Sequence, residues 1–373
     1  MGLTAPGKSS VQHFLGLDGL RGVAAFAVVY VHGAILIPVG YTPKAAALAV
    51  DFFFMLSGFV IAYAYDKRLG TGGMTSRQFV TVRLIRLYPM LFMGTLMGVV
   101  LFGLSQYQKH QFDALTCSLM MAGSFVLIPV GFGVGAIAYP LNAAAWSLFF
   151  EFFVNALFAT RFGRLSPRGL AAFLVVFGIA LIAMGTYGGP WIDIGFLTPT
   201  KFLLGFVRVS YSFWAGVLVF RVGHRFALPH IPISLIAALL LLLLVVPVDN
   251  SVDNPVYNLV MVLAVFPILV AFAASAEVTG MTARLCSWAG RLSYPLYLTH
   301  FPAFRAVRAV VEMTHAAIDP RILVAGGAML SVVTAEIILL TFDEPVRRWL
   351  SKRSRARRVR SADPDLTEKL LTP

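Results

Sequence analysis

The chain has 373 residues, of which 58% are hydrophobic and only 13% are charged, and its mean hydropathy is +0.81. This composition excludes an ordinary soluble globular protein and indicates a membrane protein with several spans. The net charge of +13 needs no nucleic-acid partner, because basic residues collect in the cytoplasmic loops of multispanning proteins. Cys117 and Cys286 lie in separate segments with no ligand or redox spacing, so we predict neither a disulfide nor a metal site.

The first apolar run, from Leu17 to Gly40, is long enough to cross a membrane and carries Arg21 and His32, two residues that lipid should not tolerate. It is too long for the core of a signal peptide, so we predict an uncleaved first span. The two residues are eleven positions apart, and eleven steps of about 100° return to within about 20° of the starting direction. Both side chains therefore share one helix face, about 16 Å apart along the axis.

With Arg21 at one lipid boundary, His32 lies near the middle of a hydrocarbon core about 30 Å thick. Ionisable groups at that depth face a bundle interior or a cavity and mark a functional site. Histidine suits general base chemistry because its ordinary pKa is near neutrality. The alternative is that His32 is a hydrogen-bonded structural histidine and that Arg21 is an interfacial anchor.

Ten apolar windows are long enough to cross a membrane. They lie near 19–39, 46–65, 87–105, 143–160, 169–187, 200–220, 231–247, 256–275, 292–312 and 322–342. With the N-terminus inside, every basic cluster falls on the cytoplasmic side, provided that an eleventh run at 113–135 does not cross. We therefore predict an all-α polytopic bundle of ten transmembrane helices, with a re-entrant segment near 113–135 entering from the outer side.

This topology divides the chain into a cytoplasmic N-terminal segment (1–16), a transmembrane domain (17–348) and a cytoplasmic tail (349–373). The tail begins with the basic run SKRSRARRVR. A juxtamembrane segment held to anionic lipid headgroups is the simplest interpretation. A regulatory or partner-binding role is the alternative.

Polar residues in the second and third windows form the next candidates. Asp51 lies near the outer boundary, where it could bond another polar group or a substrate hydroxyl, while Ser57 and Gly58 favour close helix packing. Arg83 and Arg86 stand at i and i+3, on one helix face at the cytoplasmic boundary. Two convergent guanidinium groups can bind phosphate, and topology control by positive charge is the alternative.

A polar stripe marks the window 143–160, where Ser147, Glu151 and Asn155 recur at i, i+4 and i+8. The carboxylate of Glu151 needs a partner. It could orient or charge-stabilise His32, as acidic residues do in catalytic triads, or it could pair with an arginine.

Further polar residues lie in the later windows. Arg208 lies well inside its span, and Arg305 and Arg308 share one face in the outer part of the ninth. Glu312 stands four residues after Arg308, so a structural ion pair is the alternative there. His300, with Tyr297 one turn before it, is either catalytic or a packed structural histidine.

Six segments together resemble the membrane-bound acyltransferase 3 family, which includes O-acetyltransferases of bacterial surface polysaccharides. They are LDGLRGVAA followed by His32, DFFFMLSGF, RLIRLYP, WSLFFE, LSYPLYLTH and FDEP, in family order over about residues 15 to 348. The resemblance implies a ten-helix bundle in the bacterial cytoplasmic membrane. It also implies transfer of an acyl group, usually acetyl, from cytoplasmic acyl-coenzyme A to a glycan hydroxyl at the outer side.

By the same resemblance, His32 is the catalytic residue, Arg21, Arg83 and Arg86 serve activity and donor binding, and Glu151 is a recurrent functional position. The chain departs from the common pattern at Phe149-Phe150. We also expect it to lack the appended periplasmic esterase-like domain of some relatives, which leaves open how the acceptor is presented. Acyl-coenzyme A is expected as a co-substrate, with no permanently bound cofactor, and membrane lipids as partners.

These observations give one mechanism and several alternatives. His32 deprotonates the acceptor hydroxyl or carries the acyl group briefly. The candidates for the acceptor side are Asp51, Ser147, Arg208, Tyr297, His300, Arg305 and Arg308. A small-molecule acceptor, or a longer or dicarboxylic acyl group, remains open. A permease is a further alternative, although the paired halves with broken helices that are typical of transporters are not visible in the sequence.

Overall fold

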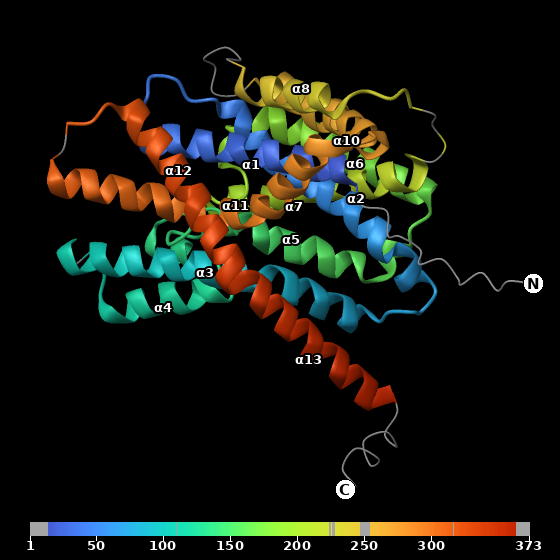
Figure 1. Ribbon diagram of the computed structural model, residues 1–373, viewed down its shortest axis with the longest axis horizontal. Helices are drawn as coiled ribbons and strands as arrows, with labels where there is room; N and C mark the ends of the chain where they lie inside the picture. The colour runs from blue at the N-terminus through green and yellow to red at the C-terminus, as the bar shows by residue number, and fades with distance from the viewer. Residues whose placement is uncertain are drawn as a thin grey trace, which may run out of the picture.

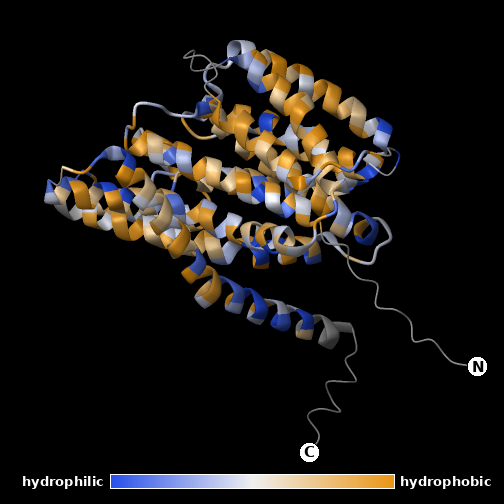
Figure 2. Cartoon of the chain, turned by 45° about the horizontal axis from the view of Figure 1, so that its top comes forward, coloured by the Kyte–Doolittle hydropathy of each residue, from blue (hydrophilic) through white to orange (hydrophobic). Residues whose placement is uncertain are grey.

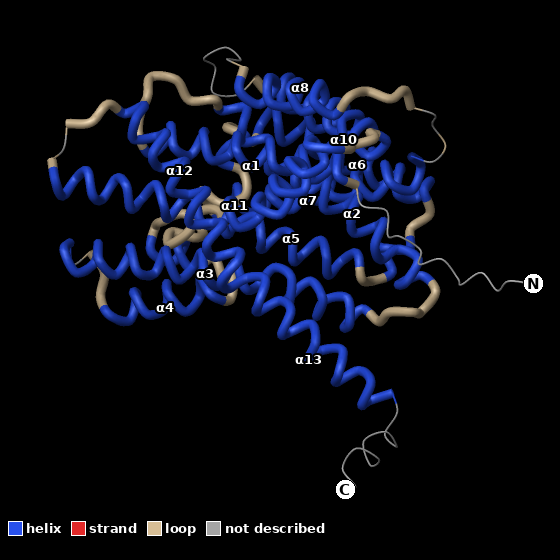
Figure 3. Tube along the Cα trace, in the orientation of Figure 1, coloured by secondary structure: helices blue, strands red, loops and turns tan. Residues whose placement is uncertain are grey.

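The computed structural model describes residues 14–109, 111–223, 225, 228–246, 254–315 and 317–362, without the side chains of 106–109 and 357–362. Within these ranges all regular structure is helical, as the trace in Figure 3 shows. The first 13 residues of the predicted segment 1–16 lie outside the described residues. So do residues 363–373 of the predicted tail.

The helices of the first half are α1 (Leu15–Leu36), α2 (Ala49–Gly70), α3 (Ser76–Lys109), α4 (Ala114–Phe125), α5 (Ala145–Phe158) and α6 (Pro167–Tyr187). Those of the second half are α7 (Pro199–Gly223), α8 (Ile233–Val245), α9 (Pro255–Val260), α10 (Phe266–Ser275), α11 (Gly280–Thr314), α12 (Pro320–Ile338) and α13 (Glu344–Ala362). Short helical turns η1 (Lys44–Leu48), η2 (Val130–Val134), η3 (Arg161–Arg164) and η4 (Trp191–Asp193) lie between them. The π-helical turns η5 (Met261–Val265) and η6 (Leu339–Asp343) join α9 to α10 and α12 to α13.

Each of the ten predicted windows contains a helix, so the all-α polytopic bundle is confirmed. Seven helical segments of the described chain are long and apolar enough to cross a membrane. The helices α5 and α8 are apolar but have only 14 and 13 residues, and α11 carries charges along its 35 residues. A count of ten crossings therefore stays a prediction, as does the re-entrant path of 113–135, which holds α4 and η2.

Helices α1 and α11 lie side by side through the centre of the bundle (Figure 1). Their contact depends on small residues, because a Cβ atom at Gly22 would come within 2.4 Å of the Ala289 Cβ, and one at Gly33 within 2.7 Å of the Phe304 ring. The close approach sets the face of α1 that carries Arg21 and His32 against α11.

Helices α2 and α7 form a second close pair. A Cβ atom at Gly58 would lie 1.9 Å from the Phe213 carbonyl oxygen, and one at Gly216 would lie 1.9 Å from that of Met55. Gly58 therefore has the packing role that the sequence predicted. This pair positions the N-terminal end of α2, where Asp51 begins a polar network, and its C-terminal end, where Asp66 lies.

The ends that carry basic residues meet on one side of the bundle. Arg221 at the end of α7 forms a bidentate ion pair with Asp66 of α2, at 2.7 and 2.8 Å, and donates to the carbonyl oxygens of Gly163 and Leu165. Arg221 therefore links the C-terminal ends of α2 and α7 and the segment that follows α5, all three of which are predicted to be cytoplasmic. Helix α13 leaves the bundle beside α3 (Figure 1) and is strongly hydrophilic beside the apolar helices (Figure 2).

Candidate active site

A cavity of about 340 Å³ opens between α1, α2, α3, α5 and α11, with the start of α13 at its rim. Its volume falls in the range of about 300–1,000 Å³ that is common for small-molecule sites. Five arginines line it: Arg21, Arg83, Arg86, Arg291 and Arg347. Three carboxylates face them: Asp18, Glu151 and Asp343. Since guanidinium groups outnumber carboxylates, the cavity suits an anionic ligand.

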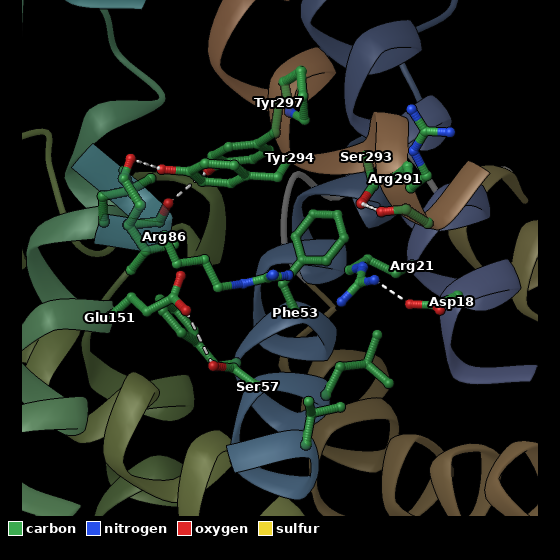
Figure 4. Close-up of a pocket in the computed structure, with 18 of the residues that line it drawn as sticks. Asp18, Arg21, Phe53, Ser57, Arg86, Glu151, Arg291, Ser293, Tyr294 and Tyr297 are labelled. Atoms are coloured by element: carbon green, nitrogen blue, oxygen red, sulfur yellow. Dashed lines mark hydrogen bonds and ion pairs between the residues drawn. The ribbon is translucent and has the colours of Figure 1, made fainter. Parts of the chain in front are cut away.

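Glu151 is held by Arg83 and Ser57 at the side of the cavity (Figure 4). Its Oε1 atom lies 2.8 Å from Nη2 of Arg83, and the Ser57 hydroxyl donates to the same oxygen over 3.1 Å. Of the two partners considered from the sequence, the structure gives Glu151 the arginine and no contact with His32. Ser57 also differs from expectation, because it lines the cavity and bonds a carboxylate instead of serving only helix packing.

Arg21 faces the same cavity from α1 and is paired with Asp18, one turn earlier on its helix. The Nε atoms of Arg21 and Arg83 are buried without a hydrogen-bond partner in the described part of the chain. The sequence analysis did not single out Asp18, although its spacing of three residues from Arg21 in LDGLRG is a signal for an ion pair.

Arg86 is the least constrained cation of the cavity. It is exposed and has no hydrogen bond or ion pair with any described residue. Arg291 and Arg347, which were not predicted as site residues, are paired with Glu344 at 2.9 Å and Asp343 at 2.7 Å. The rim thus adds two arginines to those predicted for donor binding.

The two histidines meet across the contact of α1 and α11. Nδ1 of His32 lies 2.9 Å from Nε2 of His300, and Nδ1 of His300 lies 3.1 Å from the Leu296 carbonyl oxygen. The ring of Phe301 packs edge-on against His32, with centroids 5.9 Å apart. Sequence reasoning named both histidines but not their contact, because 268 positions separate them.

Tyr297 connects this pair to the cavity. Its ring lies 5.9 Å from that of His300, its hydroxyl is 2.9 Å from the Ser147 hydroxyl, and Phe53 packs edge-on against it. Phe53, Ser147 and Tyr297 line the inner end of the cavity, whereas His32 is not among the lining residues. The imidazoles are therefore one layer of side chains beyond the arginine-lined space.

Asp51 and Arg208, two of the predicted acceptor-side residues, form a buried network with exposed fractions of 0% and 1%. The carboxylate of Asp51 receives Nε and Nη2 of Arg208 at 2.7 to 3.0 Å. The other N–H groups of the guanidinium donate to the carbonyl oxygens of Ala47, Trp191 and Ile194. All donors of Arg208 are used within the chain, so its geometry favours a structural role, and its assignment to the acceptor side stays a prediction.

Arg305 and Arg308 are likewise engaged by the protein. Arg305 donates to the Pro140 carbonyl oxygen at 2.9 Å, and Arg308 forms an ion pair with Glu312 at 2.7 Å. The second contact is the structural alternative that the sequence left open. Ser147, Tyr297 and His300 are the predicted acceptor-side residues that the structure brings together.

Comparison with known proteins identifies the chain. A family model described as acyltransferase domain matches residues 14–340. The chain belongs to this acyltransferase family. "Protein 2 in picA locus" of Rhizobium radiobacter is 33% identical over 187 residues, which are 47% of this chain and 96% of that protein. No solved structure matches the chain.

The resemblance to the acyltransferase 3 family is therefore confirmed, and its membership favours a membrane acyltransferase over the permease alternative. The matched region contains the histidine pair and four of the five arginines of the cavity. Arg347 lies just beyond it. The cavity and the histidine pair are thus the candidate active site of this acyltransferase.

Proposed function

We propose that this chain is a transmembrane O-acyltransferase of the bacterial cytoplasmic membrane, with both termini cytoplasmic. It transfers acetyl from acetyl-coenzyme A to a hydroxyl of an extracytoplasmic or lipid-linked glycan. The observation that carries the proposal is the arginine-lined cavity whose inner end adjoins the His32–His300 pair.

The donor half of the proposal depends on the charge of the cavity. Coenzyme A carries phosphates at one end and its thioester at the end of a slender pantetheine arm. Guanidinium groups bind phosphate through paired N–H donors. Phosphates can reach three arginines of the cavity: Arg86, Arg291 and Arg347. The cavity, which Arg21 also lines, has room for the pantetheine arm.

The inner end of the cavity favours a short acyl group. Phe53 and Tyr297 pack edge-on there with ring centroids 5.7 Å apart. Because these rings narrow the space next to the histidines, an acetyl group fits the approach better than a long acyl chain. A longer or dicarboxylic acyl group is the alternative, and the mass analysis of glycans described below would reveal it.

The chemistry is assigned to His32. Acting as a base, His32 takes the proton of the acceptor hydroxyl while the hydroxyl oxygen attacks the thioester carbonyl. The carbon–sulfur bond then breaks, and the coenzyme A thiolate leaves and takes up the proton. Acting as a carrier, a ring nitrogen of His32 attacks the thioester carbonyl and the coenzyme A thiolate leaves. The acceptor hydroxyl then attacks the acetyl-imidazole, loses its proton and releases the free ring. Both routes require a ring nitrogen with a free lone pair. Glu151 holds Arg83 in place beside this path.

Deleting the gene should remove O-acetyl groups from a surface glycan, and the chain supplied in trans should restore them. Mass analysis of surface glycans and of culture metabolites, with and without the protein, checks this result. A change confined to a metabolite would replace the glycan by a small-molecule acceptor. A change in neither fraction would contradict the proposed function.

Substituting alanine for Arg86 or Arg291 should raise the KM for acetyl-coenzyme A by about tenfold for each lost charge-assisted contact, with little change in kcat. The assay follows transfer of radiolabelled acetyl into glycan in inverted membrane vesicles of the deletion strain. Arg284→Ala is the matched control, because Arg284 is exposed on the same helix as Arg291 but does not line the cavity. Equal KM values in all the variants would remove these arginines from the donor site.

A further inference from the structure

The neighbouring hydrogen bonds determine which of the two imidazoles donates to the other. A carbonyl oxygen only accepts, so Nδ1 of His300 carries the proton that it donates to the Leu296 carbonyl over 3.1 Å. In a neutral ring the other nitrogen is then unprotonated. Nε2 of His300 is therefore the acceptor of the 2.9 Å contact with His32.

The partner atom must be the donor. Nδ1 of His32 faces Nε2 of His300, so it carries the proton of the His32 ring. The Val28 carbonyl oxygen, one turn earlier on α1, is a second acceptor beside that ring. In a neutral ring the proton on Nδ1 leaves Nε2 of His32 without a proton, with its lone pair directed away from His300. Free neutral histidine prefers the opposite form, with the proton on Nε2.

The surroundings keep both rings neutral. His300 is completely buried, and no carboxylate of the described part of the chain is paired with either imidazole. A buried charge without a partner is costly. Tyr297 and Phe301 also pack against the pair, with ring centroids 5.9 Å from His300 and His32 respectively. The rings are thus fixed in orientation as well as in hydrogen bonding.

We infer that His300 is a positioning residue, which selects the Nδ1–H tautomer of His32 and so presents Nε2 of His32 as the base or acyl carrier. This inference rests on the proposed function and adds to it a second histidine with a separate role. His300 itself needs no contact with the substrate. Its part resembles that of the acidic residue in a triad, performed here by a neutral imidazole.

The tautomer can be measured without any activity. In ¹⁵N NMR spectra of histidine-labelled protein in lipid nanodiscs, His32, identified among the seven histidines by its loss in His32→Asn, should show a protonated Nδ1 and an unprotonated Nε2. In His300→Leu the His32 signal should change toward the Nε2–H form. An Nε2–H tautomer in the unsubstituted protein would overturn the inference.

Kinetics provide the second test. In the vesicle assay His300→Leu should lower kcat by about 10²-fold or more, because the base is lost in most molecules. The KM for acetyl-coenzyme A should stay the same, since His300 does not line the donor cavity. His300→Gln places an amide oxygen near the position of Nε2 and should recover much of the kcat, because that oxygen accepts from His32.

The outcomes separate this inference from the proposed function. Equal kcat losses in the Leu and Gln variants, with an unchanged His32 tautomer in both, would make His300 merely structural and leave the acyltransfer proposal intact. Absence of acetyl transfer by the unsubstituted protein would remove the proposed function, while the tautomer would still be decided by the spectrum. If His300→Leu does not fold, the spectrum of the unsubstituted protein and the Gln variant still decide.

Discussion

His32→Asn should abolish acetyl transfer to glycan, with a kcat at least about 10³-fold below that of the unsubstituted protein. Asparagine keeps a polar side chain in the bundle but supplies no nitrogen with a free lone pair for a proton or an acyl group. Binding of acetyl-coenzyme A should persist, because His32 does not line the arginine cavity. Radiolabelled acetyl-coenzyme A measures both properties, by saturation binding and by transfer in membrane vesicles.

The matched control for this substitution is His315→Asn. His315 is exposed at the end of α11 and has a positive φ of 53°, a conformation that asparagine tolerates well. It should leave transfer and binding unchanged. If His32→Asn transferred acetyl at the normal rate, the catalytic role of His32 would have to be abandoned.

Arg208→Met should prevent the protein from folding stably. The substitution leaves the carboxylate of Asp51, which has an exposed fraction of 0%, without its charged partner, and breaking a buried ion pair costs about 3–5 kcal/mol. Three backbone carbonyl oxygens also lose their donor. We expect little protein to be recovered from membranes, and a marked fall in the unfolding temperature of what remains.

Two further variants sharpen this prediction. Arg208→Lys should also fold poorly, because an ammonium group has three hydrogen-bond donors where the guanidinium group uses five. The double variant Asp51→Asn with Arg208→Met should recover part of the loss, since no buried charge is left unpaired. A stable Arg208→Met protein that lost only the use of the acceptor would restore the acceptor-binding role that the sequence suggested.

Local periodicity made the helices and one face of the site predictable. The ten apolar windows all contain helices, because membrane-length hydrophobicity is a property of neighbouring residues. The shared face of Arg21 and His32 follows from the helical repeat, and both side chains lie on the α11 side of α1. The family motifs are also short local patterns, which is why the resemblance could be stated before the structure.

Contacts between distant segments were not predictable. Nothing near Arg208 in the sequence shows that Asp51, 157 positions away, would neutralise it, so the sequence suggested a substrate ligand where the structure has a buried ion pair. His32 and His300 were both named, but their pairing depends on the close approach of α1 and α11. Arg291 and Arg347 were not predicted as site residues, because positive charge at a membrane boundary is also explained by topology.

The central claim is that the arginine cavity holds the acyl donor with its thioester directed to the histidine pair. A cryo-electron microscopy structure of the protein in nanodiscs with bound acetyl-coenzyme A tests it most directly. We predict phosphate density beside Arg86 and Arg291, and the acetyl group beyond Tyr297 within reach of Nε2 of His32. Donor density in the groove beside Asp66 and Arg164, or an acetyl group remote from His32, would contradict the account.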